Sequence, residues 1–361
     1  MIRKILIGIA ALAAALLLLL IMALLFRAVR QHQVAESLAI ASPSGIDEAG
    51  FVEIGGIRQY IQIRGRNRAN PVILFLHGGP GISMMGLTPV FRTWEKDFTL
   101  VQWDQRGAGK TYGRNGGIAE ASGMTIPRMA EDGIEVARYL EHRLHKRKII
   151  VLGHSWGTVL GLMMVRQHPE LFAAYVGTGQ LVDKQENEAA SFEMALASAE
   201  AAHDKDAVRA LKAAGPPPYR TFADLLVERN YLEKFDIPSE KNLFDTFLPM
   251  VAFAPNYSLI DCYNQLAAAS FSQHQLYEPL NPFDARKLGL DFNTPFFVLE
   301  GDRDSNTPTV LGQRYLAQIR APVKRFVLIP DAGHDAVLTK SDVFLLDLVR
   351  YVRPVAIAAG G

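Results

Sequence analysis

The sequence predicts an α/β protein with a mostly parallel sheet, flanked by helices and preceded by a membrane-spanning helix. Three observations lead to this prediction. Short apolar segments alternate with helical segments along most of the chain, a long charge-free apolar run opens it, and the alternation is interrupted once, over residues 181–290. Strands that alternate with helices are typical of a parallel sheet covered on both faces. The interruption contains helical patterns only and is predicted to be an insertion.

The N-terminal run covers residues 5–26 and contains no charged, polar or proline residue. As a helix it would span about 33 Å, close to the thickness of a hydrocarbon core. A cleaved signal sequence is the alternative, but its apolar part is usually about 7–15 residues long and a small-residue cleavage site follows closely. Here the nearest such pattern is Ala39-Ile40-Ala41. We therefore predict an uncleaved, single-pass anchor, with the folded part expected outside the cytoplasm although basic residues on both sides leave the orientation open.

Residues 27–48 contain Ser, Pro and Gly and are predicted to be a polar tether. Residues 51–65 predict a hairpin that turns at Gly55-Gly56. The apolar runs beyond it predict strands at 72–76, 99–103, 149–152, 175–177, 296–299 and 325–329. Helices are predicted at 126–145, 158–168, 310–319 and 342–352. The predicted domain thus has two core parts, 49–180 and 291–355, with the helical insertion 181–290 between them.

Composition excludes several classes of protein. The formal net charge is +1, so no strong field favours nucleic acid as a partner. Cys262 is the only cysteine, which excludes a disulfide within the chain and a cysteine metal cluster. The histidines and glutamates show no metal-binding spacing. We expect neither a metal nor a cofactor.

Gly153-His154-Ser155-Trp156-Gly157 follows a predicted strand and opens a predicted helix. This G-x-S-x-G pattern places a serine on a sharp strand-to-helix turn, where its hydroxyl projects above the sheet. The flanking glycines remove side chains that would collide in such a turn. The context predicts that Ser155 is a nucleophile rather than an ordinary loop serine.

His77-Gly78-Gly79-Pro80-Gly81 follows the predicted strand 72–76. A glycine-rich turn can direct backbone N–H groups at an anion. In a fold with a G-x-S-x-G turn, one oxyanion donor comes from this kind of loop and the other from the residue after the nucleophile. We therefore assign an oxyanion hole to the N–H groups of Gly79 and Trp156. A phosphate-binding turn is the alternative, but no G-x-G-x-x-G or lysine-bearing phosphate loop supports it.

Two later loops supply the partners of the serine. Gly301-Asp302-Arg303-Asp304 follows the strand 296–299 and offers two carboxylates, of which Asp304 is favoured because it lies further into the loop. His334 follows the strand 325–329 and completes the chain order Ser, Asp, His of the α/β-hydrolase fold. Ser155, Asp304 and His334 are thus the predicted catalytic triad, which hydrolyses an acyl substrate through an acyl-enzyme.

Three motifs together resemble the proline iminopeptidase branch of the α/β-hydrolases: His77 to Gly81, Asp104-Gln-Arg-Gly-Ala-Gly109, and Gly153 to Gly157. The resemblance implies a serine triad beneath a helical cap, here residues 181–290, and removal of an N-terminal residue, often proline, from peptides. It also implies that the loop beginning at Asp104 shapes the site without joining the chemistry. Proline-specific members bind the free amine with cap glutamates, one of them in a tryptophan-rich segment. In this chain all three tryptophans lie outside the cap.

A buried substrate amine requires a carboxylate partner. The first acidic cluster of the predicted cap is Asp183, Glu186 and Glu188, and we select Glu186 as the substrate-binding residue. A solvated helix start is the alternative, since acidic residues are favoured in a first helical turn.

The sequence thus predicts a membrane-anchored serine hydrolase that acts as an aminopeptidase on small peptides. A carboxylesterase or amidase for substrates without a free amine is the first alternative. A non-catalytic binding protein on a hydrolase scaffold is the second, and the complete triad disfavours it. Fold alone does not choose between these activities.

Overall fold

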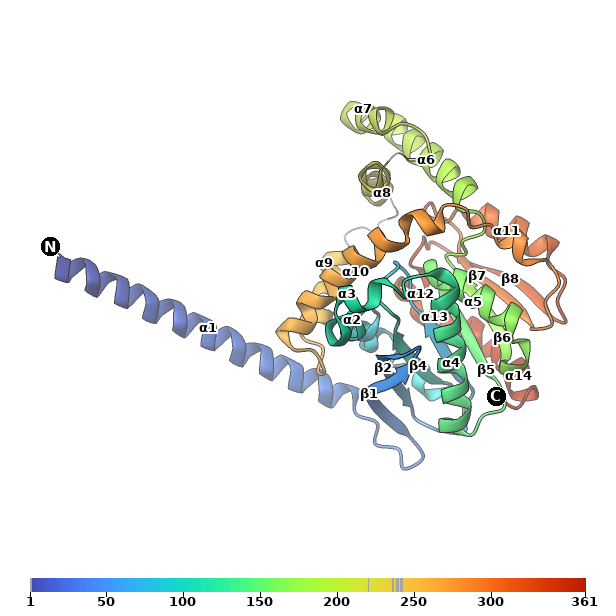
Figure 1. The fold of residues 1–361 in the computed structure, drawn as a ribbon, viewed down its shortest axis with the longest axis horizontal. Helices are drawn as coiled ribbons and strands as arrows, with labels where there is room; N and C mark the ends of the chain where they lie inside the picture. Colours follow the sequence, from blue (N-terminus) through green and yellow to red (C-terminus); the bar gives the residue numbers. More distant parts are fainter. Residues whose placement is uncertain (1, 220, 236, 238–239, 241–242) are drawn as a thin grey trace.

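The computed structural model describes residues 2–219, 221–235, 237, 240 and 243–361. Among them, one eight-stranded sheet has the order β1-β2-β4-β3-β5-β6-β7-β8 (Figure 1). β1 pairs antiparallel with β2 and β2 with β4, whereas all later pairs are parallel. The strands are β1 (Ile46–Ile54), β2 (Ile57–Gly65), β3 (Val72–Leu76), β4 (Thr99–Asp104), β5 (Ile149–His154), β6 (Phe172–Thr178), β7 (Phe296–Gly301) and β8 (Lys324–Ile329). The prediction of a mostly parallel α/β sheet is confirmed, and so is that of the hairpin turning at Gly55-Gly56.

Both faces of the sheet are buried, which is why most strands read as continuous apolar runs. In β3, Leu74 packs into the hydrophobic cluster on one face and Phe75 into the cluster on the other. The first face is covered by α4 (Ile126–Leu144), α5 (Trp156–Gln167) and α11 (Thr309–Gln318). The second is covered by α13 (Ser341–Asp347) and α14 (Arg353–Ala358), which a π-helical turn, Leu348–Val352, connects.

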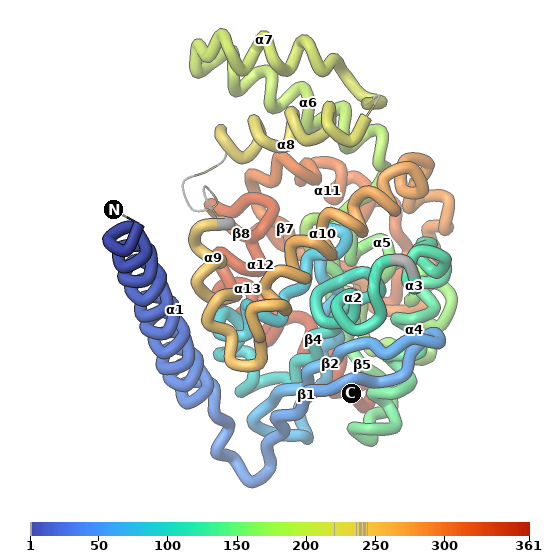
Figure 2. Tube along the Cα trace, turned by 60° about the vertical axis from the view of Figure 1, so that its left-hand side comes forward, coloured from blue at the N-terminus to red at the C-terminus, as the bar shows by residue number. Residues whose placement is uncertain are grey.

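The predicted insertion between β6 and β7 is helical over its described residues. It contains α6 (Lys184–Ala201), α7 (Lys205–Ala214), α8 (Phe222–Phe235), α9 (Leu243–Ala252) and α10 (Leu259–Leu280). Helices α6 to α8 share a small core of their own, which includes Phe192, Leu211 and Leu225. These helices lie on one side of the sheet, with α10 crossing above the strand ends (Figure 2). We call residues 181–290 the cap.

The N-terminal helix α1 runs from Ile2 to Leu38, farther than the apolar run. The most apolar 18 residues of α1 have a mean hydropathy of 3.1, and none of them is buried. The helix is therefore long and apolar enough to cross a membrane, although a signal sequence has the same properties. The prediction of a tether over 27–48 is wrong for 27–38, because no Gly or Pro breaks the helix before Pro43. Irregular chain is limited to residues 39–45, and β1 begins at Ile46.

The short helices α2 (Gly109–Asn115), α3 (Gly117–Ala121) and α12 (Ala336–Thr339) were not part of the sequence prediction. Each has fewer than eight residues, too short for a clear helical period in the sequence.

Candidate active site

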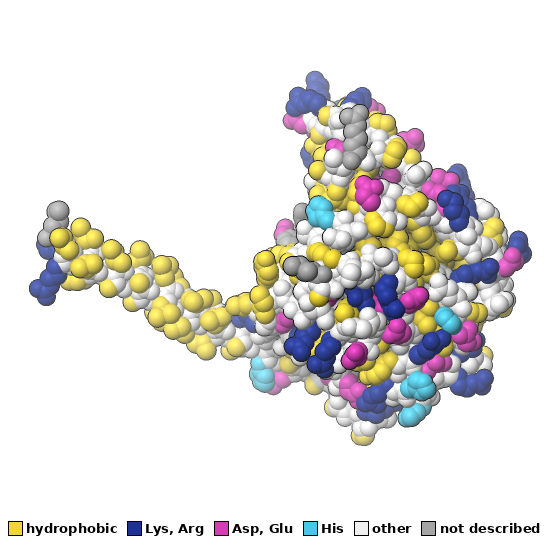
Figure 3. Space-filling view, viewed as in Figure 1, with side chains coloured by type: hydrophobic (Ala, Val, Ile, Leu, Met, Phe, Trp, Pro, Cys, Tyr) yellow, Lys and Arg dark blue, Asp and Glu magenta, His cyan; other side chains and the backbone are white. Residues whose placement is uncertain are grey.

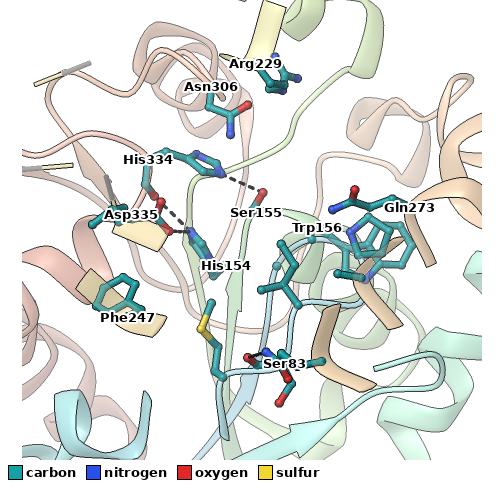
Figure 4. Close-up of a pocket in the computed structure, with 18 of the residues that line it drawn as sticks. Ser83, His154, Ser155, Trp156, Arg229, Phe247, Gln273, Asn306, His334 and Asp335 are labelled. Carbon is teal, nitrogen blue, oxygen red and sulfur yellow. Dashed lines mark hydrogen bonds and ion pairs between the residues drawn. The ribbon is translucent and has the colours of Figure 1, made fainter. Parts of the chain in front are cut away.

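The structure brings the predicted triad together at the carboxyl ends of the parallel strands. Ser155 follows β5, Asp304 follows β7 and His334 follows β8. His334 Nε2 lies 2.9 Å from Ser155 Oγ (Figure 4). His334 Nδ1 lies 2.9 Å from Asp304 Oδ2. This is the relay geometry that lets an imidazole accept the serine proton while a carboxylate orients it.

At positions 153 and 157, which flank the turn at Ser155, there is room for no residue larger than glycine. Ser155 has φ 55° and ψ −120°, a conformation that L residues rarely adopt. A Cβ on Gly153 would lie 2.6 Å from the carbonyl oxygen of Gly157, and one on Gly157 would lie 2.1 Å from that of Leu76. The close approach of β5, α5 and β3 therefore requires both glycines of the G-x-S-x-G pattern.

Asp304 is held by its own loop. Its Oδ1 accepts the backbone N–H groups of Asn306 and Thr307, both at 2.8 Å, and its Oδ2 accepts the Thr307 hydroxyl at 2.7 Å. Asp302, the other carboxylate considered, accepts one side-chain bond, from the N–H of Ala332 at 3.2 Å. The loop thus aims Asp304, and not Asp302, at the histidine.

Within this site, His334 and Asp304 each stabilise the charged form of the other. Burial lowers the pKa of His334, but the Asp304 carboxylate outweighs it and, with Asp335 and Glu240, raises that pKa to about 9. Burial likewise raises the pKa of Asp304, but His334 outweighs it and holds the pKa below its ordinary value. Glu300 lies fully buried beside Asp304, and burial together with the Asp304 charge raises its pKa well above the usual range. Asp304 is therefore the ionised acid and Glu300 the neutral one.

The two predicted oxyanion donors both line the cavity that contains Ser155. Trp156 is the first residue of α5, where an N–H has no acceptor within the helix. Gly79 has φ 115°, which favours glycine. The neighbouring Gly78 lies so close that a Cβ there would be 3.2 Å from Ser155 Cβ. The loop after β3 therefore packs directly against the serine.

The loop after β4 supports this arrangement from behind. Gln105 donates to the carbonyl of His77 at 3.1 Å and accepts the indole N–H of Trp156 at 3.0 Å. Arg106 forms a buried ion pair with Asp132, with Nε and Oδ2 2.9 Å apart. These contacts agree with the structural role that the family resemblance implied for the loop.

A cavity of about 810 Å³ lies between the sheet edge and the cap, and Ser155 and His334 open into it. Glu186 does not line this cavity: it pairs with Arg286 at 2.9 Å and its side chain is 51% exposed. The position of Glu186 therefore argues against its selection as the substrate-binding residue. Two positions along a helix differ by about 200° in direction, so Glu188 on the same helix faces the cavity instead.

Glu188 is the functional candidate that the sequence reasoning missed. It is buried, with an exposed fraction of 5%, and its Oε1 accepts Lys184 and, at 2.5 Å, Arg229. Within the described part of the chain, its Oε2 has no hydrogen-bond partner. Glu186 and Glu188 point in different directions from α6. Knowing which face of this helix lies toward the sheet would have identified Glu188 as the residue that faces the cavity.

The described residues contain no group of three or more His, Cys, Asp or Glu side chains that could hold a metal ion. The site as seen consists of side chains and backbone amides.

The chain belongs to the α/β hydrolase fold family, whose sequence pattern it matches over residues 71–341. A Bacillus subtilis (strain 168) protein named probable aminopeptidase YbaC is 28% identical over 307 residues, which cover 84% of this chain and 95% of that protein. The proline iminopeptidase of Neisseria gonorrhoeae is 32% identical over 124 residues, 34% of this chain and 36% of its own.

Among solved structures, the proline iminopeptidase-related protein of Thermus thermophilus has a TM-score of 0.60 at 20% identity, covering 87% of this chain and 98% of that one. The resemblance to the proline iminopeptidase family is therefore confirmed by sequence relatives. The structural likeness, at this identity, supports the fold.

Proposed function

We propose that the protein is a serine hydrolase that acts through an acyl-enzyme. Ser155 attacks the acyl carbonyl while His334 accepts its proton, and Asp304 orients and stabilises the imidazolium. The Gly79 and Trp156 N–H groups stabilise the oxyanion, and His334 then protonates the leaving group. Water, deprotonated by the same histidine, releases the acyl group. The observation that carries the proposal is the pair of 2.9 Å contacts from His334 to Ser155 and Asp304.

The reaction we favour is aminopeptidase cleavage of small peptides. The names of the sequence relatives support it, and so does a carboxylate in the cavity that can receive a substrate amine. Glu188 lines the cavity, and its buried Oε2, which has no partner among the described residues, can accept a charge-assisted hydrogen bond from an ammonium group once the carboxylate turns toward the cavity. Glu188→Gln should lower kcat/KM on aminoacyl arylamides while sparing the same compounds with an acetylated amine. Glu186→Gln, which changes a residue outside the cavity, is the matched control.

Hydrolysis of esters or amides without a free amine is the second candidate. It is favoured by the apolar side chains that line the outer cavity, among them Leu226, Leu248 and Leu266. A panel of aminoacyl arylamides against aryl esters separates the two, because an aminopeptidase should prefer the free-amine compounds and lose that preference when the amine is blocked.

A fluorophosphonate probe tests the hydrolase proposal itself. It should label the wild-type chain at Ser155 and leave Ser155→Ala unlabelled. Because the change removes only a hydroxyl, the Ser155→Ala protein should keep the wild-type circular dichroism spectrum. A folded wild-type protein that resists labelling would instead point to a non-catalytic binding protein.

We further propose that α1 remains attached as a single membrane span, with the hydrolase domain outside the cytoplasm. Its last turns contact the cap: Arg27 donates to the carbonyls of Ala252 at 3.0 Å and Tyr257 at 2.6 Å, and Gln31 donates to that of Ala254 at 2.7 Å. Cleavage after Ala41 would discard these contacts. Intact mass of the membrane-extracted protein tests retention, and protease treatment of intact cells tests the side on which the domain lies.

A further inference from the structure

An exposed apolar stripe lies on the cap where α9 and α10 meet. We call it the cap edge, and it consists of Leu248 (46% exposed), Leu259 (58%), Ile260 (61%), Tyr263 (65%) and Leu266 (56%). On α10, Ile260, Tyr263 and Leu266 are three residues apart and Leu259 precedes Tyr263 by four, which places the four along one broad face of the helix. Leu248, Tyr263 and Leu266 also line the cavity, whereas Leu259 and Ile260 are exposed outside it, so a partner outside the folded domain is needed to cover that part of the stripe.

The apolar run of α1 ends beside the cap edge. Phe26, its last residue, meets Phe253 in the α9–α10 connection edge to face, with ring centroids 5.8 Å apart. The next residue, Arg27, bonds to Ala252 in α9. Hydrophobic side chains continue from α1 onto the adjoining edge of the folded domain (Figure 3). If residues 5–26 cross the hydrocarbon, this connection lies at the membrane surface.

Charge at this point suits a phospholipid surface. Arg30, one turn beyond the apolar run, is exposed and lies 5.8 Å from the centre of the Phe253 ring. A long basic side chain near the end of a membrane-spanning helix can reach the lipid headgroups. The segment that would enter the bilayer thus lies against the same α9–α10 connection that carries the cap edge. The continuity with α1 therefore identifies the bilayer as the occupant.

The substrate cavity opens at the same edge. Leu248, Tyr263 and Leu266 belong both to the cap edge and to the lining of the cavity that contains Ser155. Ala252, the acceptor of the Arg27 bond, also lines it. The outer wall of the cavity thus touches the membrane-proximal end of α1.

We propose that the cap edge rests on the phospholipid bilayer that α1 enters, so that the mouth of the cavity faces the lipid. The inference rests on the proposed anchoring by α1. A substrate with an apolar tail, dissolved in the bilayer, can then pass to Ser155 without its tail crossing water.

Single labels can test this placement, because Cys262 is the only cysteine. In the full-length Cys262→Ser protein, reconstituted in phosphatidylcholine vesicles, we would introduce Ile260→Cys at the cap edge and Leu17→Cys in α1. Leu346→Cys on α13, 69% exposed, is the matched control on the core. Each thiol carries an environment-sensitive fluorophore, and a spin-labelled phosphatidylcholine serves as quencher. Leu259→Cys is a second cap-edge site in case the first variant does not fold.

The expected result is quenching of the labels at 17 and 260, with at least twofold stronger quenching at 260 than at 346. Quenching at 17 with equal, weak quenching at 260 and 346 would overturn the inference and leave the anchor in place. Absence of quenching at 17 would overturn the anchor, and the inference with it. Activity is not part of the readout, so failure of the proposed hydrolase chemistry would be distinguishable.

Discussion

Replacement of Asp304 by asparagine should abolish turnover by forcing His334 into the wrong tautomer. The Oδ1 position accepts the N–H groups of Asn306 and Thr307, so the amide oxygen of the new side chain must stay there. The amide nitrogen then takes the Oδ2 position, 2.9 Å from His334 Nδ1, and donates to it. A histidine that accepts at Nδ1 carries its proton on Nε2, where it can no longer accept the proton of Ser155.

The expected loss in kcat is about 10⁴-fold, the magnitude known for the triad aspartate of a serine protease. Asp302→Asn is the matched control: its carboxylate accepts one side-chain bond, from the N–H of Ala332, which an amide oxygen can also accept, so its kcat should stay within about threefold. Both variants would be assayed on the best substrate of the panel. Similar losses in the two variants would refute the reasoning, since that loop would then not discriminate between the acids.

The same substitution should also change stability with pH. The rise in the pKa of His334 from 6.5 to about 9 corresponds to roughly 3 kcal/mol. Because the pKa is raised in the folded state, this stabilisation is complete below about pH 6.5 and is lost as the pH passes 9. The free energy of unfolding of Asp304→Asn should thus fall furthest below wild type near pH 6 and approach it near pH 10. A difference that did not vary with pH would contradict the proposed ion pair.

Three further predictions concern the site and its support. For an ester substrate, kcat/KM should rise with a midpoint near pH 9 as His334 loses its proton, and Asp335→Asn should move that midpoint to lower pH because it removes a negative charge that raises the pKa of His334. Gly157→Ala should cost roughly 1–3 kcal/mol or more in denaturant unfolding, since its Cβ would meet the backbone of Leu76, whereas Gly50→Ala, with open space around it, should cost little. Arg106→Ala should cost roughly 1.5–3 kcal/mol of stability, because the buried Asp132 loses one of its two arginine partners and keeps Arg128, with kcat nearly unchanged.

The positions of the catalytic residues in the α/β core could be predicted well, because the sequence patterns that identify them are short-range. The glycines at 153 and 157 are required by contacts within one strand-turn-helix unit, and Ser155 could therefore be placed on that unit from the pattern alone. Asp304 was separated from Asp302 by its position in the loop, and the structure adds the hydrogen bonds that aim it.

The cap and the end of α1 depended on contacts between distant segments. Glu186 and Glu188 are equivalent in a sequence, and only the direction of α6 over the sheet shows which one faces the cavity. The helical extension to Leu38 is likewise supported by distant partners, because Arg27 and Gln31 bond to the cap more than two hundred residues later. The absence of Gly and Pro before Pro43 permits the extension, but the sequence does not show the contacts with the cap.

The charge cluster around Glu188 provides a test between the two candidate classes of substrate. Lys184 and Arg229 already occupy one of its oxygens, so a substrate ammonium must be accommodated beside two cations. Burial lowers the pKa of Lys184 despite the opposing attraction of Glu188, so Lys184 releases its proton more readily than a free lysine does. A cation bound at Oε2 of Glu188 would lower that pKa further and favour loss of the Lys184 proton. Amine binding by this site should therefore release a proton and tighten as pH rises, until the substrate amine itself deprotonates. An ester without an amine has no such coupling, and a KM that falls with pH for free-amine substrates alone is the signature that distinguishes an aminopeptidase.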